Sequence, residues 1–179
     1  MVIGMKKLFV IFIVLVIRFF SVEIDKNILI PDNAIRFRVI ANSNLDNDQE
    51  IKKLVSKELQ KELYKNLKDV KNIDDAREFL MSNTSSLEKS VEETLLKNNM
   101  DPVFDVNYGI NHFPEKVYNG VEYKAGEYES LVVTLGEGVG DNWWCVLFPP
   151  LCLMEAEEVK DSKDIEYKFF VKELIDKYF

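Results

Sequence analysis

The stretch from Gly136 to Leu153, GEGVGDNWWCVLFPPLCL, contains the rarest residue types of this 179-residue chain. It holds both tryptophans and both cysteines of the protein, and the two cysteines flank a pair of prolines. Three glycines precede the tryptophans, and glycine adopts unusual backbone angles more readily than any other residue. This composition is unlike that of a generic helix or strand, and it predicts a shaped loop that is either cross-linked or used for binding.

Upstream of this stretch, the hydrophobic pattern predicts a strand followed by two helices. Apolar and basic residues alternate over Ile35–Ile40, IRFRVI, which is the period of a half-buried strand. A capped amphipathic helix of about twenty residues should begin near Asp46. A second should begin near Asp74, whose carboxylate suits a helix N-terminus, and should end before Pro102.

The remainder of the chain predicts further strands and a closing helix. Strands are expected between Phe104 and Leu135, with a hairpin turn at Asn119-Gly120, and a helix is expected over residues 161–178. We therefore expect residues 34–179 to form a single α+β domain. Its sheet should be mostly antiparallel, with two long helices packed on one face and a C-terminal helix.

The N-terminus resembles a targeting segment. Residues 1–22 begin with two lysines and continue into the apolar run Leu8–Ile17, the pattern of a secretory signal peptide. This run is shorter than the roughly 20 apolar residues that a membrane-spanning helix needs. Because the cleavage site around Ser21 is poor, the alternative is an uncleaved anchor, which would be the only membrane contact. Residues 23–33 are then expected to form a linker, and the protein is expected to work outside the cytoplasm.

The charge of the chain excludes some classes of function. Its formal net charge is −8 and basic residues do not cluster, so binding to nucleic acid is not expected. The Gly136-x-Gly-x-Gly pattern is followed by tryptophans and prolines rather than by a helix, which argues against a nucleotide loop. Two cysteines and one histidine lack zinc-site spacing. We therefore expect neither a cofactor nor a metal.

The two cysteines could have a structural or a catalytic role. Cys145 and Cys152 could close a small disulfide loop around Pro149 and Pro150, or both could be buried free thiols. Alternatively, Cys145 could act as a nucleophile with His112, the only histidine, as its base, which would make the protein an extracytoplasmic thiol hydrolase. Since no recognised catalytic pattern supports this chemistry, we expect the protein not to be an enzyme.

Trp143 and Trp144 are adjacent, and neighbouring side chains in extended backbone point to opposite faces. One ring could therefore anchor the core while the other stays near the surface, where tryptophan often anchors a partner. The alternative is that both rings are buried.

Three stretches of the chain resemble the stage II sporulation protein R family of endospore-forming bacteria. They are Ile35–Ser43 (IRFRVIANS), Ala125–Leu131 (AGEYESL) and Gly136–Cys152, with NWWCVLFPPLC as its most specific part. The resemblance covers residues 34–155. The family fingerprint maps here onto Asn42, Ser43, Gly126, Tyr128, Trp143, Trp144, Cys145, Pro149, Pro150 and Cys152.

The resemblance implies a signalling role. Members of this family are made in the forespore and exported toward the space between the two membranes of the sporangium. There they are needed to activate a membrane-embedded aspartic protease, which removes the pro-sequence of a mother-cell sigma factor. The family has no established catalytic residues to carry over, so the fingerprint residues are expected to serve structure or partner binding.

Overall fold

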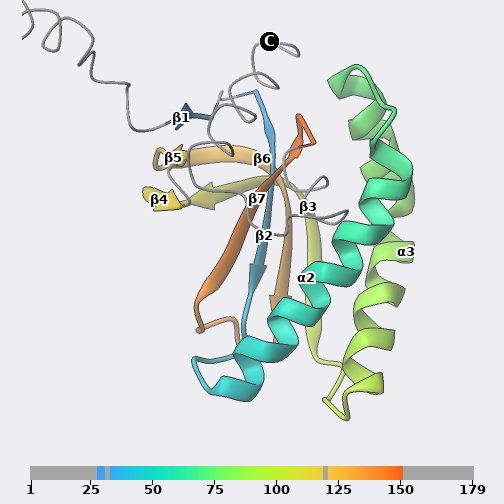
Figure 1. Ribbon diagram of the computed structural model, residues 1–179, viewed down its shortest axis with the longest axis vertical. Coiled ribbons are helices and arrows are strands. Elements are labelled where there is room, and N and C mark those ends of the chain that lie inside the picture. The colour runs from blue at the N-terminus through green and yellow to red at the C-terminus, as the bar shows by residue number, and fades with distance from the viewer. Residues whose placement is uncertain (1–27, 31–32, 119–120, 151–179) are drawn as a thin grey trace, which may run out of the picture.

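A computed structural model describes residues 28–30, 33–118 and 121–150 of the chain (Figure 1). The expected signal peptide or anchor at residues 1–22 and the expected helix at 161–178 lie outside the described residues. Within the described part, none of the helices combines the length and apolar character needed to cross a bilayer.

The core of the fold is a four-stranded sheet with the strand order β3-β6-β2-β7. The strands are β2 (Ile35–Ile40), β3 (Phe104–Phe113), β6 (Gly126–Leu135) and β7 (Asn142–Phe148). Strand β2 pairs parallel with β6 and antiparallel with β7, and β3 pairs antiparallel with β6. The sheet is thus mixed rather than purely antiparallel. Two helices lie between β2 and β3 in the sequence, and after them β3 runs antiparallel to β2. Because β6 pairs antiparallel with β3, β6 runs parallel to β2.

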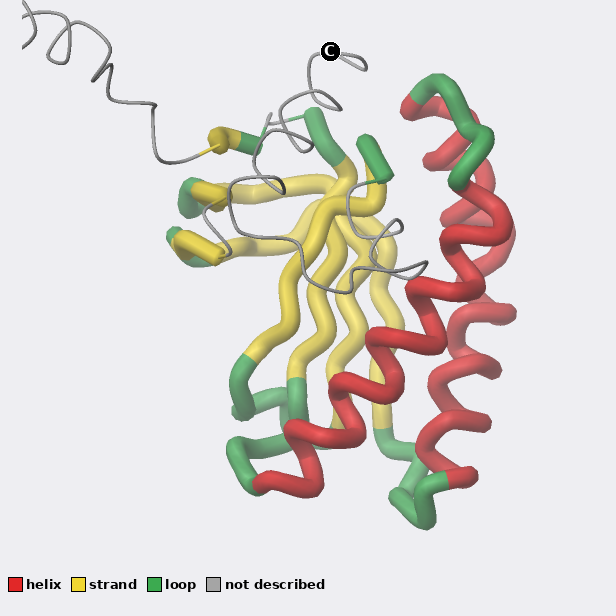
Figure 2. The backbone as a smooth tube through the Cα atoms, viewed as in Figure 1, coloured by secondary structure: helices red, strands yellow, loops and turns green. Residues whose placement is uncertain are grey.

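Two long helices, α2 (Asp46–Leu67) and α3 (Ile73–Lys97), cover one face of this sheet (Figures 1 and 2), as the sequence predicts. Their apolar stripes pack with alternate residues of the strands, including Phe37 and Leu131, into one buried core. Helix α3 is capped at its N-terminus by Asn72, whose side-chain oxygen accepts a 2.9 Å hydrogen bond from the backbone amide of Asp75.

A second, three-stranded sheet has the order β1-β5-β4. Strands β4 (Lys116–Tyr118) and β5 (Val121–Tyr123) form an antiparallel hairpin around the predicted turn. Strand β1 (Ile28–Leu29) pairs parallel with β5, so part of the expected linker is a strand.

The stretch that begins at Gly136 is only partly a loop. Residues 136–141 connect β6 to β7, but Asn142–Phe148 forms strand β7 itself, which corrects the expectation of a shaped loop throughout. The run NWWCVLF shows no apolar–polar alternation because its side chains from Trp144 to Phe148 are buried on both faces. Since alternation is the usual signal of a strand, the pattern hid this one.

Candidate functional site

Two loops that are far apart in sequence meet at one end of the main sheet. They are residues 41–45, between β2 and α2, and residues 136–141, between β6 and β7; we call them the paired loops. They meet because β2 and β6 are parallel neighbours, so the C-terminal ends of both strands lie at the same end of the sheet (Figure 1). The backbone amides of Val139 and Gly140 donate to the carbonyl oxygens of Asn42 (3.2 Å) and Ala41 (2.9 Å). The amide of Asp141 donates to Oδ1 of Asn44 at 2.6 Å.

The side chain of Asn42 connects the paired loops to helix α2. Its Oδ1 accepts a 2.9 Å hydrogen bond from the amide of Glu137, and its Nδ2 donates to Oδ2 of Asp48 at 2.9 Å. The hydroxyl of Ser43 donates to the same carboxylate oxygen at 2.6 Å. Asp48 is only 5% exposed, and the two donors satisfy a carboxylate that would otherwise be costly to bury. The fingerprint residues Asn42 and Ser43 therefore fix the shape of this end of the molecule.

The glycines of the second loop are needed for this close approach. Gly136 has a φ of +55°, and a Cβ atom placed there would overlap the side chain of Asn42. At Gly140, a Cβ atom would overlap the backbone carbonyl of Ser43. Gly136 and Gly140 therefore allow the two loops to approach each other closely.

A buried lysine, Lys52, adds a further link between α2 and the paired loops that the sequence pattern does not predict. Nζ of Lys52 donates to Oε1 of Gln49 (2.6 Å) and to the carbonyl oxygen of Asp141 (2.9 Å). Gln49 in turn donates from Nε2 to the carbonyl oxygen of Ser43 at 2.9 Å. Burial lowers the pKa of Lys52 from its ordinary value because it disfavours the charged ammonium. In the sequence, Lys52 reads as one charge among many on the polar side of α2.

On this fixed frame the paired loops present two apolar side chains to solvent. Leu45 is 70% exposed and Val139 is 71% exposed, one on each loop. Because hydrogen bonds already fix the shape of both loops, little conformational freedom would be lost if a partner bound here.

The two tryptophans point to opposite faces of β7, as extended backbone predicts. The ring of Trp143 is half-buried on the helix side and lies 5.2 Å from that of Phe37, edge to face. Trp144 is 2% exposed on the other side, 4.9 Å from the ring of Phe113. Neither ring is a freely exposed anchor. The exposed apolar side chains at this end of the molecule are those of the paired loops, Leu45 and Val139.

Two fingerprint residues, Gly126 and Tyr128, lie near Phe113, whose ring is 6.2 Å from that of Tyr128 and 4.9 Å from that of Trp144. The guanidinium carbon of Arg36 lies 3.2 Å from the centroid of the Tyr128 ring, and that of Arg38 lies 4.8 Å from the centroid of Phe113. A Cβ atom on Gly126 would sit 3.1 Å from the Tyr128 ring, so this glycine makes room for the tyrosine. These contacts give Gly126 and Tyr128 a packing role through cation–π interactions and burial.

The structure does not bring Cys145 and His112 together. Cys145 lies on β7 and His112 on β3, the two opposite edges of the sheet, with β6 and β2 between them. Three strand spacings put their backbones roughly 14 Å apart. His112 is exposed and pairs through Nδ1 with Oε1 of Glu127 at 2.9 Å. Nothing in this arrangement supports the thiol hydrolase.

Cys145 itself is buried and disulfide-bonded. The only other cysteine in the sequence is Cys152, which lies outside the described residues. Pro149 and Pro150, which lie between them, are both buried.

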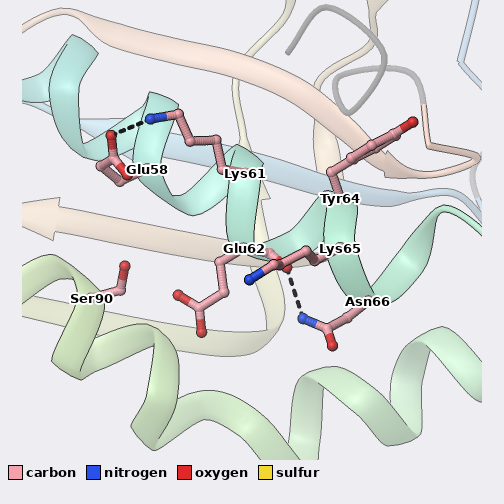
Figure 3. Close-up of a pocket in the computed structure, with 7 residues that line it drawn as sticks. All are labelled: Glu58, Lys61, Glu62, Tyr64, Lys65, Asn66 and Ser90. Carbon is pink, nitrogen blue, oxygen red and sulfur yellow. Dashed lines mark hydrogen bonds and ion pairs between the residues drawn. The ribbon is translucent and has the colours of Figure 1, made fainter. Parts of the chain in front are cut away.

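Other candidate sites are weaker. Within residues 28–30, 33–118 and 121–150, no group of three or more histidine, cysteine or acidic side chains is placed to hold a metal ion. A cavity of about 780 Å³ lies along the polar sides of α2 and α3 (Figure 3), with side chains of both charge signs. Lys61 there is paired with Glu58 at 2.6 Å, and the hydroxyl of Ser86 donates to Glu62 at 2.7 Å. None of the predicted site residues lines it.

Comparison with known proteins agrees with the resemblance. Residues 31–158 match the family described as stage II sporulation protein R. The chain is 40% identical over 145 residues to the stage II sporulation protein R of Bacillus subtilis strain 168. That alignment covers 79% of this chain but 65% of the relative, so the chain spans a little under two thirds of the relative's length. No solved structure matches the chain. The chain therefore belongs to the stage II sporulation protein R family.

Proposed function

We propose that this protein is an exported signalling protein of sporulation that activates a membrane-embedded aspartic protease, which then processes a mother-cell sigma factor precursor. Membership of the stage II sporulation protein R family supports the role in sporulation. The basic and apolar pattern of residues 1–22 supports export. The protein acts by binding the extracytoplasmic face of the protease.

The observation that carries this proposal is the preformed surface of the paired loops. Backbone and side-chain hydrogen bonds hold both loops in one shape, so little conformational entropy is lost when a partner binds. Leu45 and Val139 offer apolar contact area on this surface. A rigid surface with exposed apolar groups suits a protein ligand.

The experiment replaces both exposed side chains in the variant Leu45→Asp/Val139→Asp. The hydrogen bonds between the paired loops use no atom of these two side chains, so the loop shape is kept. Aspartate is also a favourable residue at position 45, which precedes the first turn of α2. In sporulating cells we expect the precursor to remain unprocessed on immunoblots, while the variant accumulates and keeps the circular dichroism spectrum of the parent.

The matched control is Met81→Asp/Ile110→Asp, which alters two side chains of similar exposure, 65% and 68%, outside the paired loops. This control should support normal processing. Normal processing by the loop variant, or an equal loss in both variants, would count against the paired loops as the binding surface.

A further inference from the structure

A cavity of about 370 Å³ opens beside the paired loops, between the start of α2, the end of α3 and the end of β6. Its inner wall is apolar and consists of the buried residues Ile51, Leu95 and Leu135. Its outer wall includes the exposed acidic residues Asp101 and Glu137. The cavity therefore combines an apolar interior with an acidic mouth.

The ionisable side chains that line this cavity are all acidic among the described residues. Among the residues that the structure describes, three carboxylates line it, those of Asp48, Asp101 and Glu137, and no lysine or arginine does. The nearly buried carboxylate of Asp48 lies in the cavity wall and accepts hydrogen bonds from Asn42 and Ser43. A cation entering the cavity would therefore meet the exposed carboxylates of Asp101 and Glu137 at its mouth.

The three carboxylates are not arranged as a metal site. Among the described residues no group of three acidic, histidine or cysteine side chains converges as metal ligands would. Carboxylates spread around an apolar cavity suit an elongated organic cation instead, because an arginine or lysine side chain pairs a methylene stem with a charged head.

We propose that this cavity binds an arginine or lysine side chain that the protein partner presents. The stem lies against Ile51 and Leu95, and the charged head meets the carboxylates. The volume lies at the low end of the range for ligand pockets, which fits one side chain rather than a larger molecule. The inference rests on the proposed function, since it names the chemistry by which the partner is recognised.

The position of the cavity fits this role. Asn42 and Gly136 belong to the paired loops and also line the cavity. One partner segment could therefore cover Leu45 and Val139 while inserting a basic side chain beside them. A central inserted side chain surrounded by apolar contacts is a common organisation of binding hot spots.

A direct test uses a small probe and the full chain labelled with ¹⁵N and purified in detergent. The probe is the peptide acetyl-Gly-Arg-Gly-amide, compared with the same peptide carrying citrulline, the neutral isostere of arginine. We expect the arginine peptide to shift the amide signals of Val103, Gly136 and Glu137 in a saturable way. The citrulline peptide should bind about tenfold more weakly or worse, because it lacks the charge. Equal binding of the two peptides, or shifts confined to other parts of the protein, would overturn the inference.

Charge variants identify the site. The variant Asp101→Asn/Glu137→Gln should lose the response to arginine, since it removes the two carboxylates at the mouth. The control Asp69→Asn/Glu88→Gln neutralises two exposed acids away from the cavity and should keep the response. If both variants respond alike, the cavity is not the binding site.

Sporulating cells separate this inference from the proposed function. The variant Asp101→Lys/Glu137→Lys should block precursor processing, whereas Asp69→Lys/Glu88→Lys should not. If the Leu45→Asp/Val139→Asp variant blocks processing and the cavity variant does not, the inference is wrong and the proposed function stands. If neither variant blocks processing, the paired loops are not the binding surface either.

Discussion

The side chain of Asn42 occupies the space in which a Cβ atom on Gly136 would have to lie. Its Oδ1 accepts the backbone amide of Glu137, the next residue, at 2.9 Å. This contact joins two sequence motifs that are far apart along the chain and gives both a physical reason. The asparagine needs a neighbour without a side chain, and the glycine needs an acceptor for the amide that follows it.

Replacing Gly136 by alanine should therefore lower the free energy of unfolding. The residue has a φ of +55°, and the added methyl group must displace Asn42, so we expect a loss of about 1–3 kcal/mol. Urea denaturation measures it. The matched control is Gly109→Ala, where the nearest heavy atom to a new Cβ is 3.8 Å away. This variant should stay within about 0.5 kcal/mol of the parent. Similar losses in both variants would contradict the account of the paired loops.

A partly buried carboxylate should make stability depend on pH. Glu129 accepts hydrogen bonds from Arg77 (2.8 Å) and from the hydroxyl of Tyr108 (2.5 Å). Burial alone would raise the pKa of Glu129, but these two donors outweigh it and lower the pKa below its ordinary value. The folded state thus binds this proton less tightly than the unfolded state. The hydrogen bonds to the ionised Glu129 therefore stabilise the fold above the pKa that this residue has in the unfolded state. This contribution is lost as the pH falls through the lower pKa of Glu129 in the folded state.

The variant Glu129→Gln tests this sign. At neutral pH it should unfold more easily than the parent by about 1–2 kcal/mol. The difference should shrink as the pH falls below the ordinary pKa of a glutamate, because the unfolded parent is protonated first and the folded parent only at the lowered pKa of Glu129. Urea denaturation across this range measures the difference. As a comparison, Glu93→Gln removes an exposed pair with Lys97 (3.2 Å) and should change stability by at most a few tenths of a kcal/mol at any pH. A difference that grows on acidification would show that the sign is wrong.

The two tryptophans should differ in fluorescence. The variant Trp143→Phe leaves only Trp144, which is 2% exposed and should emit at short wavelength with weak quenching by acrylamide. The variant Trp144→Phe leaves the half-buried Trp143, which should be quenched more strongly. The reverse order of quenching would mean that β7 presents its faces the other way round.

Much of the fold follows from periodicity in the sequence. The alternation in IRFRVI predicts strand β2 with its observed bounds, and the stripes at three- and four-residue steps predict α2 and α3. These signals work because each element buries one face against one core and leaves the other face different in composition. The same periodicity correctly predicts that both helices lie on one face of the sheet.

The features that the sequence does not predict share a physical cause. The sequence predicts a loop where strand β7 lies, because burial on both faces removes the alternation of apolar and polar residues. The parallel pairing of β2 with β6 depends on the path of the whole chain. The candidate site was visible as two separate motifs, Asn42-Ser43 and the glycines from Gly136. That they bond to each other, and that Lys52 is buried beneath them, depends on contacts between residues far apart in sequence, which no local pattern encodes.

The central claim is that the paired loops contact the membrane-embedded protease. The most direct measurement places a photoreactive phenylalanine derivative at position 139, or at position 81 as the control, and irradiates sporulating cells. The account predicts a cross-linked product between the protease and the chain labelled at 139, and none from the chain labelled at 81. Cross-linking to the protease from position 81 but not from position 139 would contradict it.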